Sequence, residues 1–189
     1  MNKLTVIIGI CIVAIVIAAI AMLVPLQEVN APTQNGEPVV KAPTNFMECA
    51  AQGNPVAESY PRQCNTPSGA HFVEDIGNAL DKVDLIQATS PQPNENISSP
   101  LMVGGEARGN WYFEASFPIE VQDANGKVIG QGYAQAQGEW TTEDFVPFES
   151  IEITFPAQPA GSMGKIILRK DNPSGLPEHD DYLEVPIVF

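Results

Sequence analysis

The stretch that decides the fold runs from Ile97 to Lys127 and reads Ile-Ser-Ser-Pro-Leu-Met-Val-Gly-Gly-Glu-Ala-Arg-Gly-Asn-Trp-Tyr-Phe-Glu-Ala-Ser-Phe-Pro-Ile-Glu-Val-Gln-Asp-Ala-Asn-Gly-Lys. Short apolar runs alternate here with turn residues, as they do in a β-sandwich. The triplet Ala124-Asn125-Gly126 predicts a hairpin, because Asn and Gly tolerate the positive φ that a type I′ turn demands. The stretch therefore predicts antiparallel strands.

The same pattern continues to the end of the chain. Phe113, Ala115 and Phe117 alternate with polar residues, and so do the apolar residues of 151–155, which is the period of a strand with one buried face. Because Pro118 cannot donate to a sheet, we expect a bulge or an edge position there. The prediction is an all-β, antiparallel two-sheet sandwich with strands at Asp84–Ala88, Leu101–Arg108, Tyr112–Gln122, Val128–Gln135, Phe148–Phe155, Gly164–Lys170 and Tyr182–Phe189.

Several short motifs in this region resemble a known family. They are Ser99-Pro100-Leu101, Gly105-Glu-Ala-Arg-Gly109, Phe113-Glu-Ala115, Asp123-Ala-Asn-Gly126 and Asp171-Asn-Pro-Ser-Gly175. Together they resemble the immunoglobulin-like domain associated with bacterial spore germination proteins (Gmad2). The resemblance implies an immunoglobulin-like fold over residues 81–189, an exported location and a noncatalytic module that is germination- or cell-wall-associated.

The N-terminus predicts a membrane anchor in residues 1–25. Leu4 to Val24 is apolar except for Thr5, and a helix of this length spans a hydrocarbon core of about 30 Å. Lys3 before the run favours a cytoplasmic N-terminus and an exported C-terminal part, so we expect a single-pass cell-membrane protein. A cleaved secretory signal is the alternative, with cleavage after Val29-Asn-Ala31. Residues 26–44 are Pro-rich and read as an exposed linker.

Residues 45–80 form a segment bracketed by Cys49 and Cys64. It resembles a small cysteine-bracketed motif of other exported bacterial proteins. In an oxidising compartment two lone cysteines are most simply a disulfide, which for a loop of this size contributes roughly 3 kcal/mol to stability. Thiol-redox chemistry and a metal site that includes His71 are the alternatives.

The chain carries no motif for a cofactor, and we predict a protein that is not an enzyme. Asp and Glu number 23 against 9 Lys and Arg, a net charge of −14, so nucleic acid is excluded as a partner. An envelope enzyme remains the rival, either a thiol-redox protein or a hydrolase with the carboxylates of Glu139 and Glu143. His179-Asp-Asp181 could ligate a metal, but a surface loop is the simpler interpretation, and we predict no metal site.

The function predicted from the sequence is a membrane-anchored extracytoplasmic binding or scaffolding module of the bacterial cell envelope. Its partners would be the membrane, through the N-terminal helix, and a cell-wall polymer or an envelope protein. Aromatic residues near turns are the candidate contact residues, namely Trp111, Tyr112, Trp140 and Phe145. The competing interpretation is that these side chains fill the core.

Overall fold

The computed structural model describes residues 41–189. The fold described here is that of the compact unit Ala42–Phe189. Within the described residues, no helix is long and apolar enough to cross a membrane. The predicted anchor, Leu4–Val24, and most of the predicted linker lie outside these residues, so both stay predictions.

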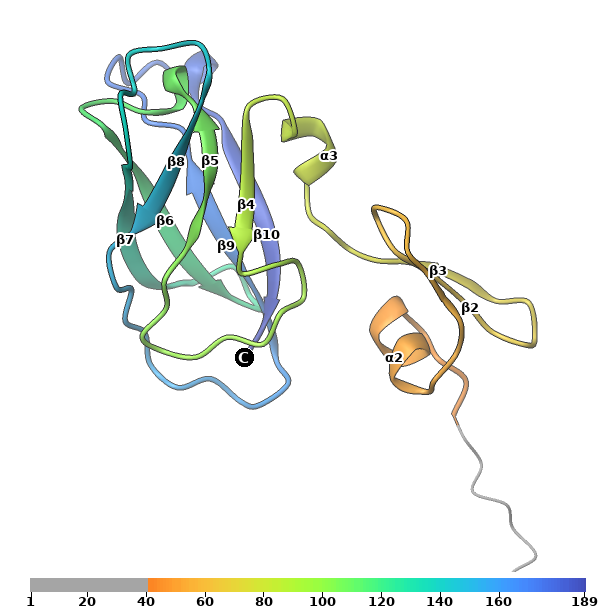
Figure 1. Ribbon diagram of the computed structural model, residues 1–189. Coiled ribbons are helices and arrows are strands. Elements are labelled where there is room, and N and C mark those ends of the chain that lie inside the picture. The colour runs from red at the N-terminus through yellow and green to blue at the C-terminus, as the bar shows by residue number, and fades with distance from the viewer. Residues whose placement is uncertain (1–40) are drawn as a thin grey trace, which may run out of the picture. The chain divides into compact units, whose positions relative to one another are not determined.

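The C-terminal part is all-β, as the alternating pattern predicts (Figure 1). Its seven strands form one antiparallel sheet in the order β10-β9-β6-β7-β8-β5-β4. Two short 3-10 helices, η1 (Gly109–Trp111) and η2 (Pro177–His179), and the helix α3 (Ala79–Lys82) accompany them. The strands are β4 (Ile86–Ser90), β5 (Gly104–Arg108), β6 (Ser116–Asp123), β7 (Val128–Ala136), β8 (Phe145–Ser150), β9 (Met163–Arg169) and β10 (Tyr182–Val188).

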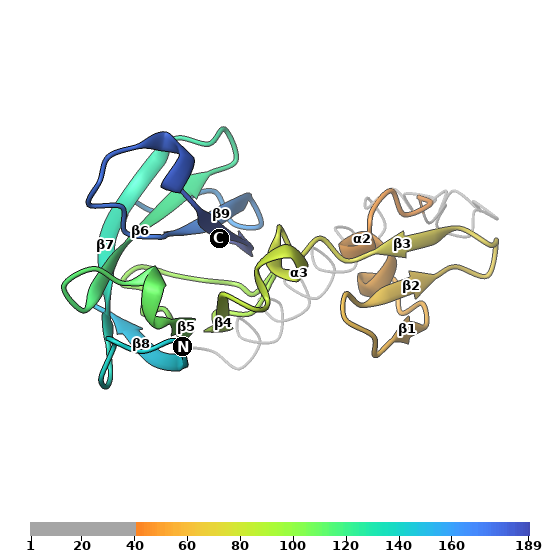
Figure 2. The same cartoon turned by 90° about the horizontal axis from the view of Figure 1, so that it is seen from above.

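The sandwich has two layers, but a single sheet makes both of them, in contrast to the two separate sheets predicted. β7 pairs with β6 along most of its length, whereas only Ala134–Ala136 pair with β8. β7 therefore turns the corner between the layers, which Figure 2 shows from above. The core between the layers is built around Trp111, Phe117 and Phe148, whose neighbours are aliphatic residues of all seven strands.

The turns explain where the predicted strand bounds fail. The hairpin at 124–126 is confirmed, but only Gly126 has a positive φ, so the turn is a type I turn with a glycine bulge. The two consecutive residues of positive φ that a type I′ turn needs are instead Glu114 and Ala115, with φ of 50° and 62°. They form a tight turn between Phe113 and Ser116, which exchange backbone hydrogen bonds. The strand predicted from Tyr112 therefore begins only at Ser116.

Two further sequence expectations change in the structure. Pro118 lies in an inner strand, but β6 pairs with β9 only from Ile119 onward, so one side of Pro118 is unpaired, and the bulge follows Val121 instead. The strand predicted at Phe148–Phe155 ends at Ser150. The hydroxyl of Ser150 is buried and accepts a hydrogen bond from the N–H of Val103. The alternation of buried and exposed residues therefore shifts after Ser150, and Ile151 is exposed.

The cysteine-bracketed segment has its own small fold. The helix α2 (Phe46–Ala51) begins at Asn45, whose side chain accepts a hydrogen bond from the N–H of Glu48. A three-stranded antiparallel sheet follows, with β1 (Val56–Ala57), β2 (Gln63–Asn65) and β3 (His71–Val73). The predicted disulfide between Cys49 and Cys64 is confirmed and joins α2 to β2. With Phe46 it forms the buried cluster of the segment.

Candidate functional site

Two of the four candidate contact residues lie in the core. Trp111 and Tyr112 are 1% and 4% exposed, and the Tyr112 hydroxyl donates to the carbonyl of Val146 at 2.7 Å. Burial raises the pKa of Tyr112 well above its ordinary value. The indole Nε1 of Trp111 has no hydrogen-bond partner among the described residues. Both side chains stabilise the sandwich and are not available at its surface.

The other two, Trp140 and Phe145, flank a loop that the strand β5 holds in place. The guanidinium of Arg108 lies 4.2 Å from the centre of the Phe145 ring and donates to the carbonyls of Asp84 and Glu143. A side chain at Gly109 would collide with the carbonyls of Trp140 and Thr142, so only glycine fits there. Both side chains are partly buried, and Trp140 packs against the core. Their role as contact residues stays a prediction.

The groups that an enzyme would need are arranged differently from a catalytic site. Cys49 and Cys64 are fully buried and joined to each other. Glu139 accepts hydrogen bonds from the side chain and the N–H of Thr141, which lower its pKa, whereas a hydrolase needs a general acid of raised pKa. Asp181 pairs with Lys82, and no group of three or more His, Cys, Asp or Glu in residues 41–189 is placed to hold a metal.

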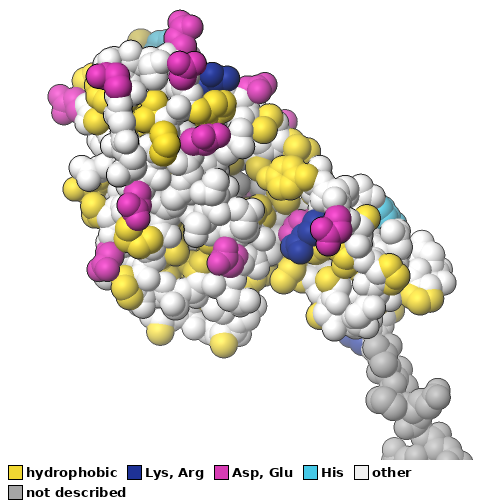
Figure 3. Space-filling model, viewed as in Figure 1, with side chains coloured by type: hydrophobic (Ala, Val, Ile, Leu, Met, Phe, Trp, Pro, Cys, Tyr) yellow, Lys and Arg dark blue, Asp and Glu magenta, His cyan; other side chains and the backbone are white. Residues whose placement is uncertain are grey.

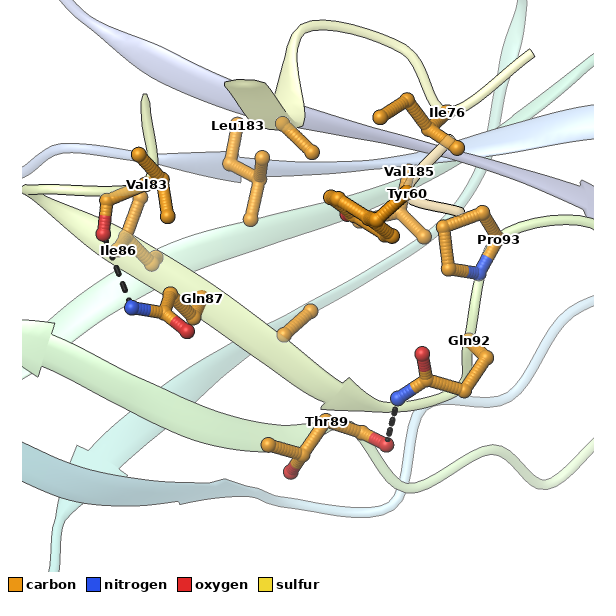
Figure 4. A pocket seen from close by; sticks show the side chains of 12 residues that line it. Tyr60, Ile76, Val83, Ile86, Gln87, Thr89, Gln92, Pro93, Leu183 and Val185 are labelled. Atoms are coloured by element: carbon orange, nitrogen blue, oxygen red, sulfur yellow. Dashed lines mark hydrogen bonds between the residues drawn. The ribbon is translucent and has the colours of Figure 1, made fainter. Parts of the chain in front are cut away.

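The best-formed site is an apolar pocket between the two edge strands of the sheet, β4 and β10 (Figure 4). Its volume of about 340 Å³ lies in the range of small-ligand pockets. Figure 4 shows the Gln87 and Gln92 amides, which donate to the carbonyls of Val83 and Thr89. The apolar wall comes from Ile76, Ala79, Val83, Ile86, Leu183 and Val185, with Tyr60 and Pro93 at one end.

An ion pair between the buried Glu74 and the half-exposed Arg62 lies beside the end of the pocket that Tyr60 lines. Glu74 is 6% exposed and accepts two hydrogen bonds from the guanidinium of Arg62, of which the Nε bond is 2.9 Å long. The bonds from Arg62 lower the pKa of Glu74. Asn94, which has a φ of 62°, donates to Glu74 and to the carbonyl of Asp75. Burial, followed by the charge of Glu74, raises the pKa of Tyr60.

Sequence reasoning missed this pocket. Its residues come from four separate segments, and each is an ordinary core or turn residue in its own stretch. One signal was present. Gly77 has a φ of 63° and lies against the carbonyl of Glu184, and this contact marks where the segment before α3 meets β10.

Comparison with known proteins agrees with the architecture. Searches of curated proteins and of solved structures gave no significant match to the chain. Residues 85–175, just under half of the chain, match the family model Gmad2, described as the immunoglobulin-like domain of bacterial spore germination. The matched residues extend from β4 to the loop Asp171–Gly175. Over residues 85–175 the β-sandwich of this chain is therefore similar to the immunoglobulin-like domain of the Gmad2 family.

Proposed function

We propose that this protein is a membrane-tethered binding module of the bacterial cell envelope, linked to germination or to the cell wall, without catalytic activity of its own. The observation that carries the proposal is the apolar pocket between β4 and β10 on a domain similar to that of the germination-associated family. The disulfide of the neighbouring segment suits an oxidising, extracytoplasmic compartment. The apolar run of Leu4–Val24 and the Pro-rich residues after it would supply the tether.

The tether is tested by the intact mass of the protein in the membrane fraction. We expect the full-length chain there, with residues after 25 accessible to protease from outside the cell. Recovery of a soluble chain that starts at Pro32 would identify the N-terminus as a cleaved signal and would refute the anchor.

The binding site is tested by a photo-crosslinking amino acid at Gln87, which is exposed and lines the pocket. The matched control places the same group at Gln131, exposed on β7 away from the pocket. In intact cells we expect an envelope protein or a cell-wall polymer to be captured at position 87 and not at position 131. Equal capture at both positions, or none at position 87, would refute the pocket as the binding site.

The rival function, an envelope enzyme, has less support. Its thiol version needs an accessible cysteine, and its hydrolase version needs a protonated carboxyl near neutral pH. Cys49 and Cys64 are buried in a disulfide, and the pKa of Glu139 is lowered. Turnover of a disulfide or a glycan by the purified protein, lost in Cys49→Ser or Glu143→Gln, would establish the enzyme in place of the binding module.

A further inference from the structure

The two edge strands of the sandwich differ in how their outer backbone groups are satisfied. β4 and β10 end the strand order, and each is hydrogen-bonded to only one strand. Such an edge presents N–H and C=O groups that can pair with another chain. Whether other parts of the chain cover these groups decides which edge is open.

The outer edge of β10 is covered along its length. The side chain of Asn78 donates to the carbonyl of Tyr182 at 2.9 Å and accepts from the N–H of Glu184 at 2.7 Å. The segment that follows β4 covers the rest. Its bonds run from Asn94 N–H to Pro186 O, from Ile97 N–H to Val188 O, and from Val188 N–H to Glu95 O.

The outer edge of β4 is not paired with another strand, and Ala88 is partly exposed there, whereas Ile86 is only 1% exposed. The N–H of Arg108 donates to the carbonyl of Leu85 at 2.8 Å, so these two residues form a hydrogen-bonded pair of the β4–β5 ladder. In an antiparallel ladder such pairs alternate, and the N–H and C=O of Ile86 and Ala88 therefore point away from β5. Among residues 41–189, no hydrogen bond outside the sheet ladders uses these groups. Ile86 and Ala88 line the pocket.

The pocket thus pairs an unused strand edge with an apolar wall from β10 and α3. An extended peptide has matching chemistry, because its backbone can bond to an edge strand while its alternate side chains enter pockets. An oligosaccharide would leave hydroxyl groups without partners against that wall. The geometry favours a peptide over a glycan.

The charges around β4 indicate what charge the bound peptide would carry. Three carboxylates lie near β4. Asp81 lies in α3, Asp84 lies just before β4, and Glu106 of β5 lies opposite Gln87. The cations of the same elements are engaged, since Lys82 pairs with Asp181 and Arg108 lies over the Phe145 ring. Figure 3 shows Asp and Glu side chains spread over this face of the molecule, with few Lys or Arg. A complementary peptide carries Lys or Arg beside its apolar residues.

Building on the proposed function, we propose that the pocket binds an extended, Lys- or Arg-flanked segment of a partner protein, which adds as a strand to β4. The backbone of Ala88, which is partly exposed, would pair with this segment. Its apolar side chains would pack on Leu183 and Val185.

The test uses the full-length protein in detergent and the labelled peptide Lys-Val-Thr-Val-Thr-Val-Lys, with a Glu-flanked version as the peptide control. In Ala88→Pro the outward N–H is lost while the β4–β5 ladder is spared, and Ala88→Ser keeps that N–H. By fluorescence anisotropy we expect the Lys-flanked peptide to bind wild type and Ala88→Ser equally. We expect about tenfold weaker binding to Ala88→Pro, the effect of one lost hydrogen bond.

A second measurement avoids any variant that fails to fold. Saturating Lys-flanked peptide should slow amide hydrogen exchange at Ala88 of the wild type by about tenfold or more, with no slowing at Gln131. Strand addition would be overturned if the Lys-flanked peptide did not bind, if the Glu-flanked peptide bound equally well, or if hydrogen exchange were not slowed. Binding of an N-acetylglucosamine oligomer in place of the peptide would overturn it as well. Capture of a partner at position 87 that Ala88→Pro leaves unchanged would overturn it too, yet leave the proposed function standing.

Discussion

At the scale of single residues, Glu114 and Ala115 occupy backbone conformations that suit other residues better. Both have positive φ in the tight turn before β6, where Asn and Gly are preferred. This backbone conformation costs about 1 kcal/mol for an L-residue that has a side chain. We expect Ala115→Gly to raise the free energy of unfolding by about 0.5–1 kcal/mol in urea denaturation, because relief of this strain exceeds the entropic cost of glycine.

The matched control for this change is Ala124→Gly in the next turn. Ala124 is exposed and is not among the residues with positive φ, so glycine brings only its entropic cost and should lower stability slightly. If both variants shift stability in the same direction, the turn at 114–115 is not strained.

The buried carboxylate of Glu74 predicts a dependence of stability on pH. Arg62 lowers the pKa of Glu74 in the folded protein. The ionised carboxylate therefore contributes its full stabilisation above the pKa of the unfolded state, near 4.5. This stabilisation is lost as the pH falls through the lower pKa of the folded state. We expect Glu74→Gln to cost about 1–2 kcal/mol at pH 7 and less toward pH 3. Thermal unfolding from pH 7 to pH 3 measures this, and parallel profiles for the two proteins would contradict it.

At the scale of elements, the disulfide holds together pieces that are too short to be stable alone. α2 has six residues and β1 only two, and their buried cluster is Phe46 with the two cysteines. In the variant with both Cys49→Ala and Cys64→Ala, we expect residues 46–73 to lose about 3 kcal/mol of protection in hydrogen exchange. The strands β5 to β9 should keep their protection against hydrogen exchange. If these strands also lost protection, the segment and the sandwich would unfold as one unit.

Elements are also the scale at which prediction from the sequence succeeded and failed. Seven strands were expected and seven are present in the sandwich, because alternation such as Phe117, Ile119 and Val121 reports a buried face directly. The bounds failed where a side chain or a turn changes the alternation locally, as Ser150 does at the end of β8. The pocket could not be foreseen, because it depends on which strands are left at the edges of the sheet.

At the scale of the whole molecule, the sandwich depends on residues that precede its first strand. The predicted boundary at residue 81 and a fragment that starts at Val83 both omit Asn78, whose side chain makes both hydrogen bonds on the β10 edge near Tyr182 and Glu184. They also omit Ile76, which is 5% exposed. Without these residues, backbone groups of an edge strand and apolar surface are left to water.

We therefore expect fragments 76–189 and 83–189 both to show the strand signal in circular dichroism, but with different stabilities. The shorter fragment should be less stable in urea by about 3–4 kcal/mol, the sum of roughly 1 kcal/mol for each lost hydrogen bond and about 2 kcal/mol for the side chain of Ile76. Asn78→Ala in the longer fragment separates the two terms and should cost about 2 kcal/mol. If the two fragments unfold at the same urea concentration, the sandwich is complete from residue 83, and the segment before α3 contributes nothing to closing the β10 edge.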